Sequence, residues 1–442
     1  MRTHRTLFRA LLVSSVVATS PGLLWGQAND PVAEAWSIHG QATTVTQGHG
    51  AFNAPYSGDH SFEPRKEIRN SFTSTLFLGF RTWDGAEVYV DPEVSGGQGL
   101  SHVAGLGGAP NGEISRVSSS ELKLALARVY LKQVFNLDGG VEAVAADQNQ
   151  LGGSRRRRRV TVTVGKLALG DIFDANAYTH DPRSQFLNLA LVDSSSWDYP
   201  ADTKGYSWGM ALEVNWDDWA FRAGSFMEPS EANGPYFDHH VGRAHGDVIE
   251  VEHDHEIGGR AGHVRILGFA NRADMGSYQE SLQAAPLAPD VMATRQPGRL
   301  KYGWGLSADQ ALTGNLGAFL RAGWNDGRTE TWAFTEIDRT VALGLALAGG
   351  GWSRPQDRVG VALAANGLSP DHRTYLAAGG LGFMLGDGRL NYGQERILET
   401  DYALALGRFV TASFDAQRIQ CPGYNRDRGP VDIFSLRLHA QY

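Results

Sequence analysis

The chain has 442 residues, with 40 Lys or Arg against 48 Asp or Glu, so its formal net charge at neutral pH is −8. Its mean hydropathy of −0.29 is too low for a bundle of membrane helices, and its single cysteine excludes a disulfide scaffold or a cysteine-rich metal protein. A nucleic-acid partner is not expected, because it would need a concentrated basic surface.

The N-terminal residues follow the order of a secretory signal peptide. Three arginines in the first nine residues precede an apolar stretch at 10–18, and Gly26-Gln27-Ala28 places small residues at a cleavage site. The apolar run is interrupted and shorter than the roughly 20 residues that a membrane-spanning helix needs. We therefore predict a signal peptide at residues 1–28 and an exported mature chain from residue 29.

Apolar and polar residues alternate with a period of two along the mature chain. Phe72, Leu76 and Phe80 share one face of a predicted strand, and Thr73 and Thr75 share the other. Such alternation is typical of strands with one apolar and one polar face. It recurs in further stretches: residues 86–93, residues 160–164, and residues 206–216, where Tyr206 is expected on the same face as Trp208 and Trp216.

A soluble antiparallel sandwich would also alternate, but three further features favour a membrane barrel. Tight turns such as Asp217-Asp218 are interleaved with long connections such as residues 228–246, as in outer-membrane barrels. Tryptophans, among them Trp216 and Trp332, gather near predicted strand ends. The last residues, 433–442, carry an apolar face, and such a sheet must close because an open edge in lipid would leave backbone groups unpaired.

The length of the mature chain sets the expected number of strands. Roughly 414 residues, at about 26 for each strand and its connection, give about 16 strands, within the porin range. About seventeen candidate strands can be found, and the doubtful one is Phe186–Asp193, which is either a strand or part of an infolded loop. We expect an all-β antiparallel barrel of 16 to 18 strands, forming a single domain over residues 29–442, with both termini in the periplasm.

Several long stretches carry a family resemblance. They are Asp174–Asn188, Ser196–Asp202, Asn366–Arg373, Ala378–Phe383, Leu385–Gly388, Pro422–Pro430 and Arg437–Ala440. Together they resemble the carbohydrate-selective porins of the OprB type, over about residues 36–442. The resemblance implies a Gram-negative outer-membrane barrel of about sixteen strands that admits small carbohydrates, such as glucose, by passive diffusion through a constricted pore. The chain departs from the family at Tyr442, where Phe is usual, and in the basic run Arg155–Arg159.

A sugar-selective pore needs aromatic rings for the faces of the sugar and charged or polar groups for its hydroxyls. For each candidate, the alternative is a polar residue that merely faces water. The candidates on predicted strands are Arg81, Glu87, Tyr89, Asp91, Glu93, Arg128 and Lys132. The candidates in the long loop are Asp174, Asn176, His180, Asp181, Arg183, Trp197 and Asp198.

The segment Asp171–Asp202 is too long for a turn and too polar to cross lipid. We predict that it folds into the lumen, with Asp181 and Arg183 near the narrowest point. The alternative is an extracellular cap.

Other patterns are weaker. Five histidines have spacing that resembles metal ligands, but a polar extracellular loop explains them without a metal: His239, His240, His245, His253 and His255. We predict no metal and no cofactor. The arginine run could bind lipopolysaccharide phosphates if it is extracellular, or could be a solvated turn. Cys421 has no partner for a disulfide.

Three classes of function remain. The first is a sugar-selective porin, the second is a general or charged-solute porin on the same barrel, and the third is a barrel enzyme or surface-binding protein. No nucleophile motif such as G-x-S-x-G occurs, so we do not expect an enzyme. The expected partners are small carbohydrates, outer-membrane lipid and lipopolysaccharide, and association between copies of the chain stays open.

Overall fold

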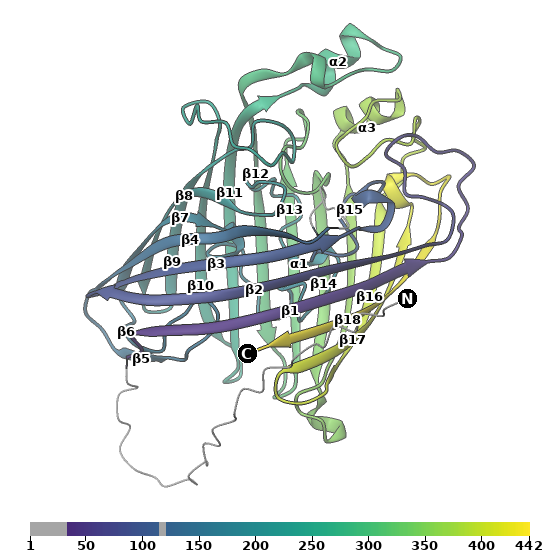
Figure 1. The fold of residues 1–442 in the computed structure, drawn as a ribbon. Helices are drawn as coiled ribbons and strands as arrows, with labels where there is room; N and C mark the ends of the chain where they lie inside the picture. The colour runs from purple at the N-terminus through teal and green to yellow at the C-terminus, as the bar shows by residue number, and fades with distance from the viewer. Residues whose placement is uncertain (1–32, 115–120) are drawn as a thin grey trace, which may run out of the picture.

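The computed structural model describes residues 33–114 and 121–442, so the predicted signal peptide at residues 1–28 lies outside the described residues. Within them, sixteen antiparallel strands form one closed barrel (Figure 1). These strands are β1 (Trp36–His49), β2 (Glu67–Trp83), β3 (Ala86–Gly97), β4 (Lys123–Asn136), β7 (Arg159–Leu167), β8 (Ser207–Trp216), β9 (Trp219–Met227), β10 (His245–Glu256), β11 (Ala261–Met275), β12 (Gln296–Ala311), β13 (Leu316–Asn325), β14 (Arg339–Ala348), β15 (Arg358–Gly367), β16 (Glu395–Ala405), β17 (Val410–Gln420) and β18 (Val431–Gln441).

The predicted alternation fixes which face of each strand meets lipid. On β2, Leu76 and Phe80 are exposed on the outer surface, whereas Thr73 and Thr75 are buried on the inner side. Tyr206 is an exception. It lies just before β8 and is buried, and its hydroxyl donates to Glu93 of β3 inside the barrel. The prediction that Tyr206 faces outward was therefore wrong, because the chain turns inward before the strand begins.

The first and last strands close the barrel, as predicted. β1 pairs with β18 over a long register in which Thr43 lies opposite His439. Gly40 and Tyr442 also exchange two backbone hydrogen bonds of 3.0 and 2.9 Å. The start of β1 and the C-terminus therefore lie at the same end of the barrel.

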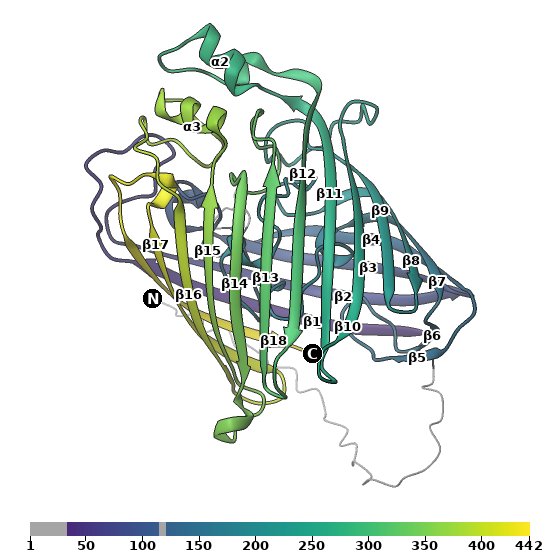
Figure 2. The ribbon, with the colours of Figure 1, turned by 180° about the vertical axis from the view of Figure 1, so that it is seen from behind.

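The two ends of the barrel differ in their connections (Figure 2). At the short-turn end most strand pairs are joined by tight turns, such as Asp217-Asp218. The opposite, long-loop end carries α2 (Tyr278–Ala284) and α3 (Pro370–Ala377). The short 3-10 helices are η1 (Leu100–Val103), η2 (Leu169–Asp171), η3 (Met292–Thr294), η4 (Gly349–Trp352) and η5 (Pro422–Tyr424). In the described part of the chain, the helices all fall short of the length and apolar character needed to cross a membrane.

The connection between β4 and β7 is unusually long for the short-turn end. It contains a separate two-stranded sheet of β5 (Val141–Val144) and β6 (Gly153–Arg156), outside the barrel order. The doubtful stretch Phe186–Asp193 is not a strand. It holds the one-turn helix α1 (Leu189–Val192) within the β7–β8 connection.

Candidate functional site

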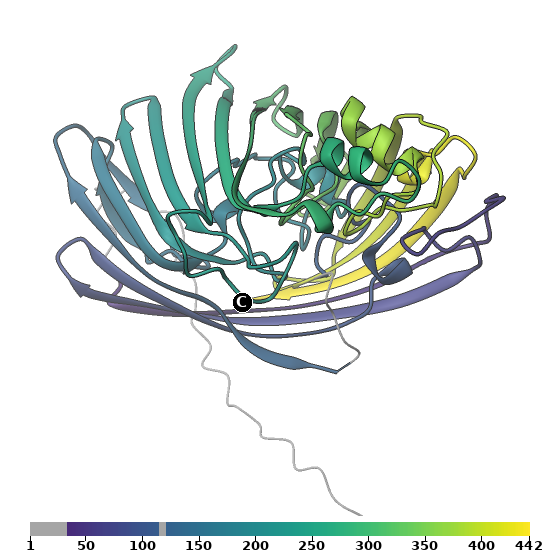
Figure 3. The ribbon, with the colours of Figure 1, turned by 90° about the horizontal axis from the view of Figure 1, so that it is seen from above.

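The connection between β7 and β8, residues 168–206, lies inside the barrel and is called here the infolded segment. Figure 3 looks into the ring of strands and shows coil inside it. Phe186 and Leu191 of this segment are fully buried and pack against Phe319 and Ala362 of the barrel wall. The predicted infolding of this segment is therefore confirmed, and the extracellular-cap alternative is not.

Buried polar contacts fasten the first part of the infolded segment to β12 and β13. Arg321 donates to the carboxylate of Asp174 and also to the backbone carbonyls of Asp174 and Thr179. The amide of Asn176 donates to the hydroxyl of Ser307 at 3.1 Å. Asp174 and Asn176 thus serve as anchors, and neither belongs to the lining of the two cavities described below.

The end of the infolded segment is fastened to the β13–β14 connection. The carboxylate of Asp198 accepts the backbone N–H groups of Trp332 and Ala333, both at 2.7 Å, and lies 3.3 Å from the Nζ of Lys301. Trp197 is 1% exposed and packs edge-on against Phe173. Trp332 is itself fully buried rather than at the membrane interface. Trp197 and Asp198 therefore hold the segment, and Trp197 presents no ring face to the lumen.

Two glycines on the inner wall allow the segment to approach closely. A Cβ on Gly305 would lie 2.8 Å from the hydroxyl of Ser194, and one on Gly323 would collide with the hydroxyl of Ser196. Any larger residue at these positions would displace the segment toward the centre of the barrel. The barrel wall and the infolded segment are therefore complementary in shape at these two positions.

Two cavities of about 660 and 160 Å³ occupy the lumen and share part of their lining. The larger one extends toward the short-turn end, where Lys132 and Glu213 line it. The smaller one extends toward the long-loop end, where Phe334 and Met384 line it. The side chains common to both mark the junction between them: Glu113, Arg183, Leu189, Tyr199, Lys204 and Tyr206.

Arg183 is the centre of this junction. Its Nε donates to Glu113 at 2.7 Å and its Nη2 to Glu93 at 3.3 Å, and the hydroxyl of Tyr206 also donates to Glu93, at 3.1 Å. Burial alone would lower the pKa of Arg183, but the carboxylates of Glu113 and Glu93 outweigh it, so the pKa is raised and the charge is kept. The junction therefore holds a fixed cation between two carboxylates.

Four further predicted residues line the larger cavity: Arg128, Lys132, His180 and Asp181. Arg128 forms a bidentate pair with Asp171, at 2.6 and 2.7 Å, and its guanidinium lies 5.2 Å from the centre of the Tyr206 ring. Lys132 lines the cavity nearer the short-turn end. The carboxylate of Asp181 accepts the backbone N–H of Arg183 at 2.9 Å, so Asp181 shapes the loop that presents Arg183. His180 lines the same cavity.

The remaining strand candidates lie outside both cavities, and two of them, Tyr89 and Asp91, hold the β4–β7 connection. The hydroxyl of Tyr89 donates to Glu87 at 2.7 Å and accepts the backbone N–H of Leu151. Asp91 accepts the amide of Asn149 at 2.9 Å. Arg81 pairs with Glu87 at 3.2 Å.

Sequence reasoning missed five of the six side chains at the junction: Glu113, Leu189, Tyr199, Lys204 and Tyr206. Glu113 belongs to the β3–β4 connection, which no pattern had singled out. Tyr199 lies within the predicted segment and was passed over in favour of Trp197, although Tyr199 is the partly exposed ring of the two. Its position within the segment gave the only usable signal.

The histidines do not converge on a metal site. His253 instead stacks on Trp219 with ring centres 4.2 Å apart. Across residues 33–114 and 121–442, no group of three or more His, Cys, Asp or Glu side chains could hold a metal ion.

A comparison with protein families matches residues 73–442 to the carbohydrate-selective porin, OprB family. The chain belongs to this family. Among solved structures it is similar to OprB of Pseudomonas putida, with 17% identity, a TM-score of 0.69, and coverage of 92% of this chain and 94% of that chain. It is also similar to the outer membrane channel DcaP of Acinetobacter baumannii, with 8% identity, a TM-score of 0.52, and coverage of 92% and 97%. A search of curated proteins found no match.

As an OprB-family porin, the chain spans the outer membrane of a Gram-negative bacterium. Short turns of such barrels face the periplasm and long loops face the exterior. The arginine run lies at the short-turn end, between β6 and β7. It therefore faces away from lipopolysaccharide, and the extracellular position that binding to lipopolysaccharide phosphates would require is not met.

Proposed function

We propose that this porin selects small neutral carbohydrates, such as monosaccharides, at the junction between its two cavities. The observation that carries this is the meeting of Arg183 with Glu93 and Glu113 beside the rings of Tyr199 and Tyr206. Charged groups hydrogen-bond strongly to hydroxyls, and aromatic rings contact the C–H faces of a sugar. The junction offers both within one narrow region.

The balance of charge at the junction favours a neutral solute over a charged one. Pores that select ions use rings of side chains of one sign. Here Glu93 and Glu113 face Arg183 and Lys204, so neither sign dominates. A sugar can exchange hydrogen bonds with successive groups along the two cavities, and weak binding at several positions lets the solute leave again.

Liposome swelling tests this proposal directly. We expect neutral monosaccharides to enter faster than size-matched acids or amines, because the junction attracts neither sign of charge. Equal rates for all solutes would instead support a general porin. A single barrel encloses both cavities, so the proposed transport needs no second copy of the chain.

A substitution at the junction tests whether this region selects between sugars. We expect Tyr199→Leu to reduce discrimination between sugars of similar size while leaving the folded barrel intact, because the partly exposed ring would lose its contact with the sugar face. The matched control is Tyr236→Leu, which removes an exposed ring in the β9–β10 connection, away from both cavities. Unchanged discrimination in Tyr199→Leu would place the filter elsewhere.

A further inference from the structure

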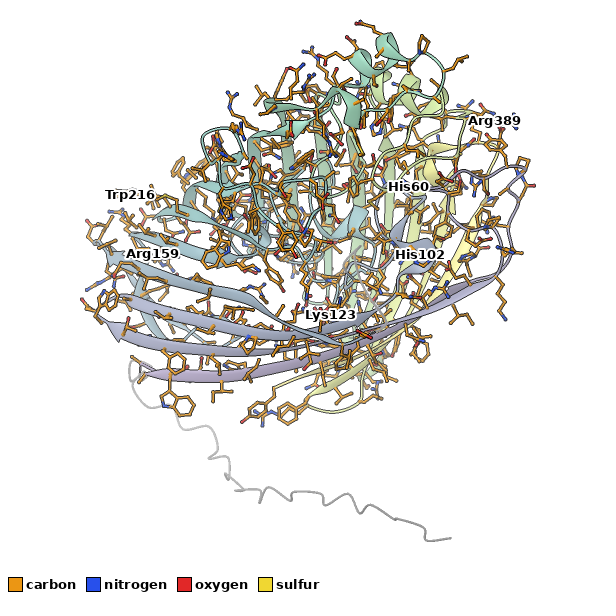
Figure 4. The ribbon with its side chains drawn as sticks, turned by 45° about the horizontal axis from the view of Figure 1, so that its top comes forward. His60, His102, Lys123, Arg159, Trp216 and Arg389 are labelled. Carbon is orange, nitrogen blue, oxygen red and sulfur yellow. The ribbon has the colours of Figure 1, made fainter. Side chains whose placement is uncertain are left out.

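The run Arg155–Arg159, called here the basic strip, lies where the β4–β7 connection rejoins the barrel. β6 ends at Arg156 and β7 begins at Arg159. Figure 4 shows Arg159 and Trp216 at one end of the molecule and His60 and Arg389 at the other. The basic strip therefore lies at the periplasmic end, beside the rim of the barrel.

Three arginines of the basic strip are engaged by neighbouring carboxylates. Arg155 and Arg159 both pair with Glu142, at 2.6 and 3.2 Å. Arg158 pairs with Asp217 at 2.6 Å and lies 4.7 Å from the ring centre of Trp216. These contacts fix the strip to the barrel rim.

The other two arginines are exposed. Within residues 33–114 and 121–442, neither Arg156 nor Arg157 has a carboxylate within ion-pair distance. The guanidinium of Arg156 donates to the backbone carbonyl of Gly139 at 3.1 Å. The backbone N–H of Arg157 donates to the backbone carbonyl of Gly140 at 2.9 Å. The strip thus presents two exposed cations, and the guanidinium of Arg156 is held by the carbonyl of Gly139.

Exposed apolar side chains lie beside the strip. Leu137 lies beside the strip, because its N–H donates to the carbonyl of Arg158, and Val141 pairs directly with Arg156. Phe135 and Trp216 are also about half exposed. Aromatic side chains at a barrel rim mark the membrane–water interface. The two cations therefore lie at the level of lipid headgroups rather than out in the periplasm.

We propose that the basic strip binds the phosphate of anionic phospholipids in the periplasmic leaflet, with Arg156 and Arg157 contacting the headgroup. Guanidinium groups bind phosphate in a bidentate manner, and clustered basic residues beside a membrane attract anionic lipid. A soluble periplasmic anion fits less well, because it would leave the exposed side chains of Phe135 and Leu137 without an apolar contact. Binding here would fix the height of the rim in the membrane.

The test is titration of the folded, detergent-solubilised porin with phosphatidylglycerol and with phosphatidylethanolamine, with bound lipid counted by native mass spectrometry. The test variant is Arg156→Gln/Arg157→Gln. The matched control is Arg260→Gln/Arg408→Gln, which removes two exposed arginines from separate short turns at the same end. Neutral-sugar swelling rates and heat-modifiable mobility verify that both variants fold.

We expect the test variant to bind phosphatidylglycerol roughly 30-fold more weakly, the loss expected for two basic residues near an anionic surface, while the control and the sugar flux stay unchanged. Equal binding by the wild type and the test variant would overturn the proposal, as would an equal loss in the control. Displacement of the lipid by inorganic phosphate or a short acidic peptide at similar concentration would show a soluble-anion site instead. The readout is lipid binding, so its failure leaves the sugar pathway unaffected.

Discussion

Arg183 bridges two carboxylates that come from different parts of the chain, Glu93 on β3 and Glu113 in the β3–β4 connection. Its planar guanidinium reaches both at once, which a lysine ammonium does less well. Truncation to alanine would be ambiguous, because it would leave Glu113 buried without its partner, a change that typically costs about 3–5 kcal/mol. A substitution that keeps the charge is therefore more informative.

We expect Arg183→Lys to weaken the block of single-channel current by a bound monosaccharide about tenfold, the cost of roughly one charge-assisted hydrogen bond. The barrel should still assemble, because the positive charge is retained. Arg65→Lys is the control, since Arg65 pairs with Glu63 on an exposed loop. Identical sugar block in both variants would show that the geometry of Arg183 does not matter for binding.

At the scale of elements, the infolded segment is held by buried ion pairs rather than by regular strand pairing. Arg321 and Asp174 are both nearly inaccessible to solvent. Breaking such a pair leaves an uncompensated buried charge. The position of the infolded segment therefore depends on a contact with β13, outside the segment itself.

Arg321→Ala should free the start of the infolded segment. We expect higher and noisier single-channel conductance, and reduced discrimination among sugars by size, in a barrel that is still heat-modifiable. Arg418→Ala removes a half-exposed ion pair with Asp432 and serves as the control. Quiet, wild-type conductance in Arg321→Ala would mean that other contacts are sufficient to hold the segment.

The extracellular helices α2 and α3 meet through a buried histidine. His372 of α3 stacks on Tyr278 of α2, with ring centres 4.4 Å apart, and its Nδ1 lies 3.1 Å from Asp338. Burial alone would lower the pKa of His372, but Asp338 and Glu336 outweigh it and raise the pKa to about 9. The imidazolium therefore stabilises the contact between the helices.

This pKa predicts how the helix contact depends on pH. The stabilisation is fully present below the unfolded value of 6.5 and is lost as pH rises through about 9, a change on the order of 3 kcal/mol. We expect faster hydrogen exchange in α3 above that pH, after correction for intrinsic rates. His372→Gln should abolish the transition. A transition that persists in this variant would assign it to another group.

At the scale of the whole molecule, closure depends on the last strand. β18 pairs with β17 on one side and β1 on the other, so its loss opens two edges at once. Unpaired backbone groups cannot be accommodated in lipid.

Deletion of Phe434–Tyr442 should therefore leave unfolded chain in the periplasm. Tyr442→Phe, which keeps the aromatic end, should assemble normally. The measurement is the amount of heat-modifiable barrel in isolated outer membranes, and a normal amount after the deletion would contradict the expectation.

The barrel could be predicted because alternation along each strand reflects a local choice between lipid and lumen, visible in residues such as Leu76 and Thr75. The infolded segment could also be predicted, because its length and polarity fit neither a turn nor a span. The roles of the individual residues within the segment could not be predicted. Whether Trp197 or Tyr199 faces the lumen, or Asp198 meets backbone N–H groups, depends on how the segment packs against strands distant in sequence. Arg183 was identified, but its partner Glu113 was not.

The width of the pore also depends on residues of the barrel wall that lie behind the infolded segment. Gly305 and Gly323 line neither of the two cavities, yet their missing side chains determine how far the infolded segment recedes from the axis. Two porins could therefore share every lining residue and still differ in the size of sugar that they admit. In this family, divergence in selectivity should be sought among wall residues of small volume as well as among the residues that sugars contact.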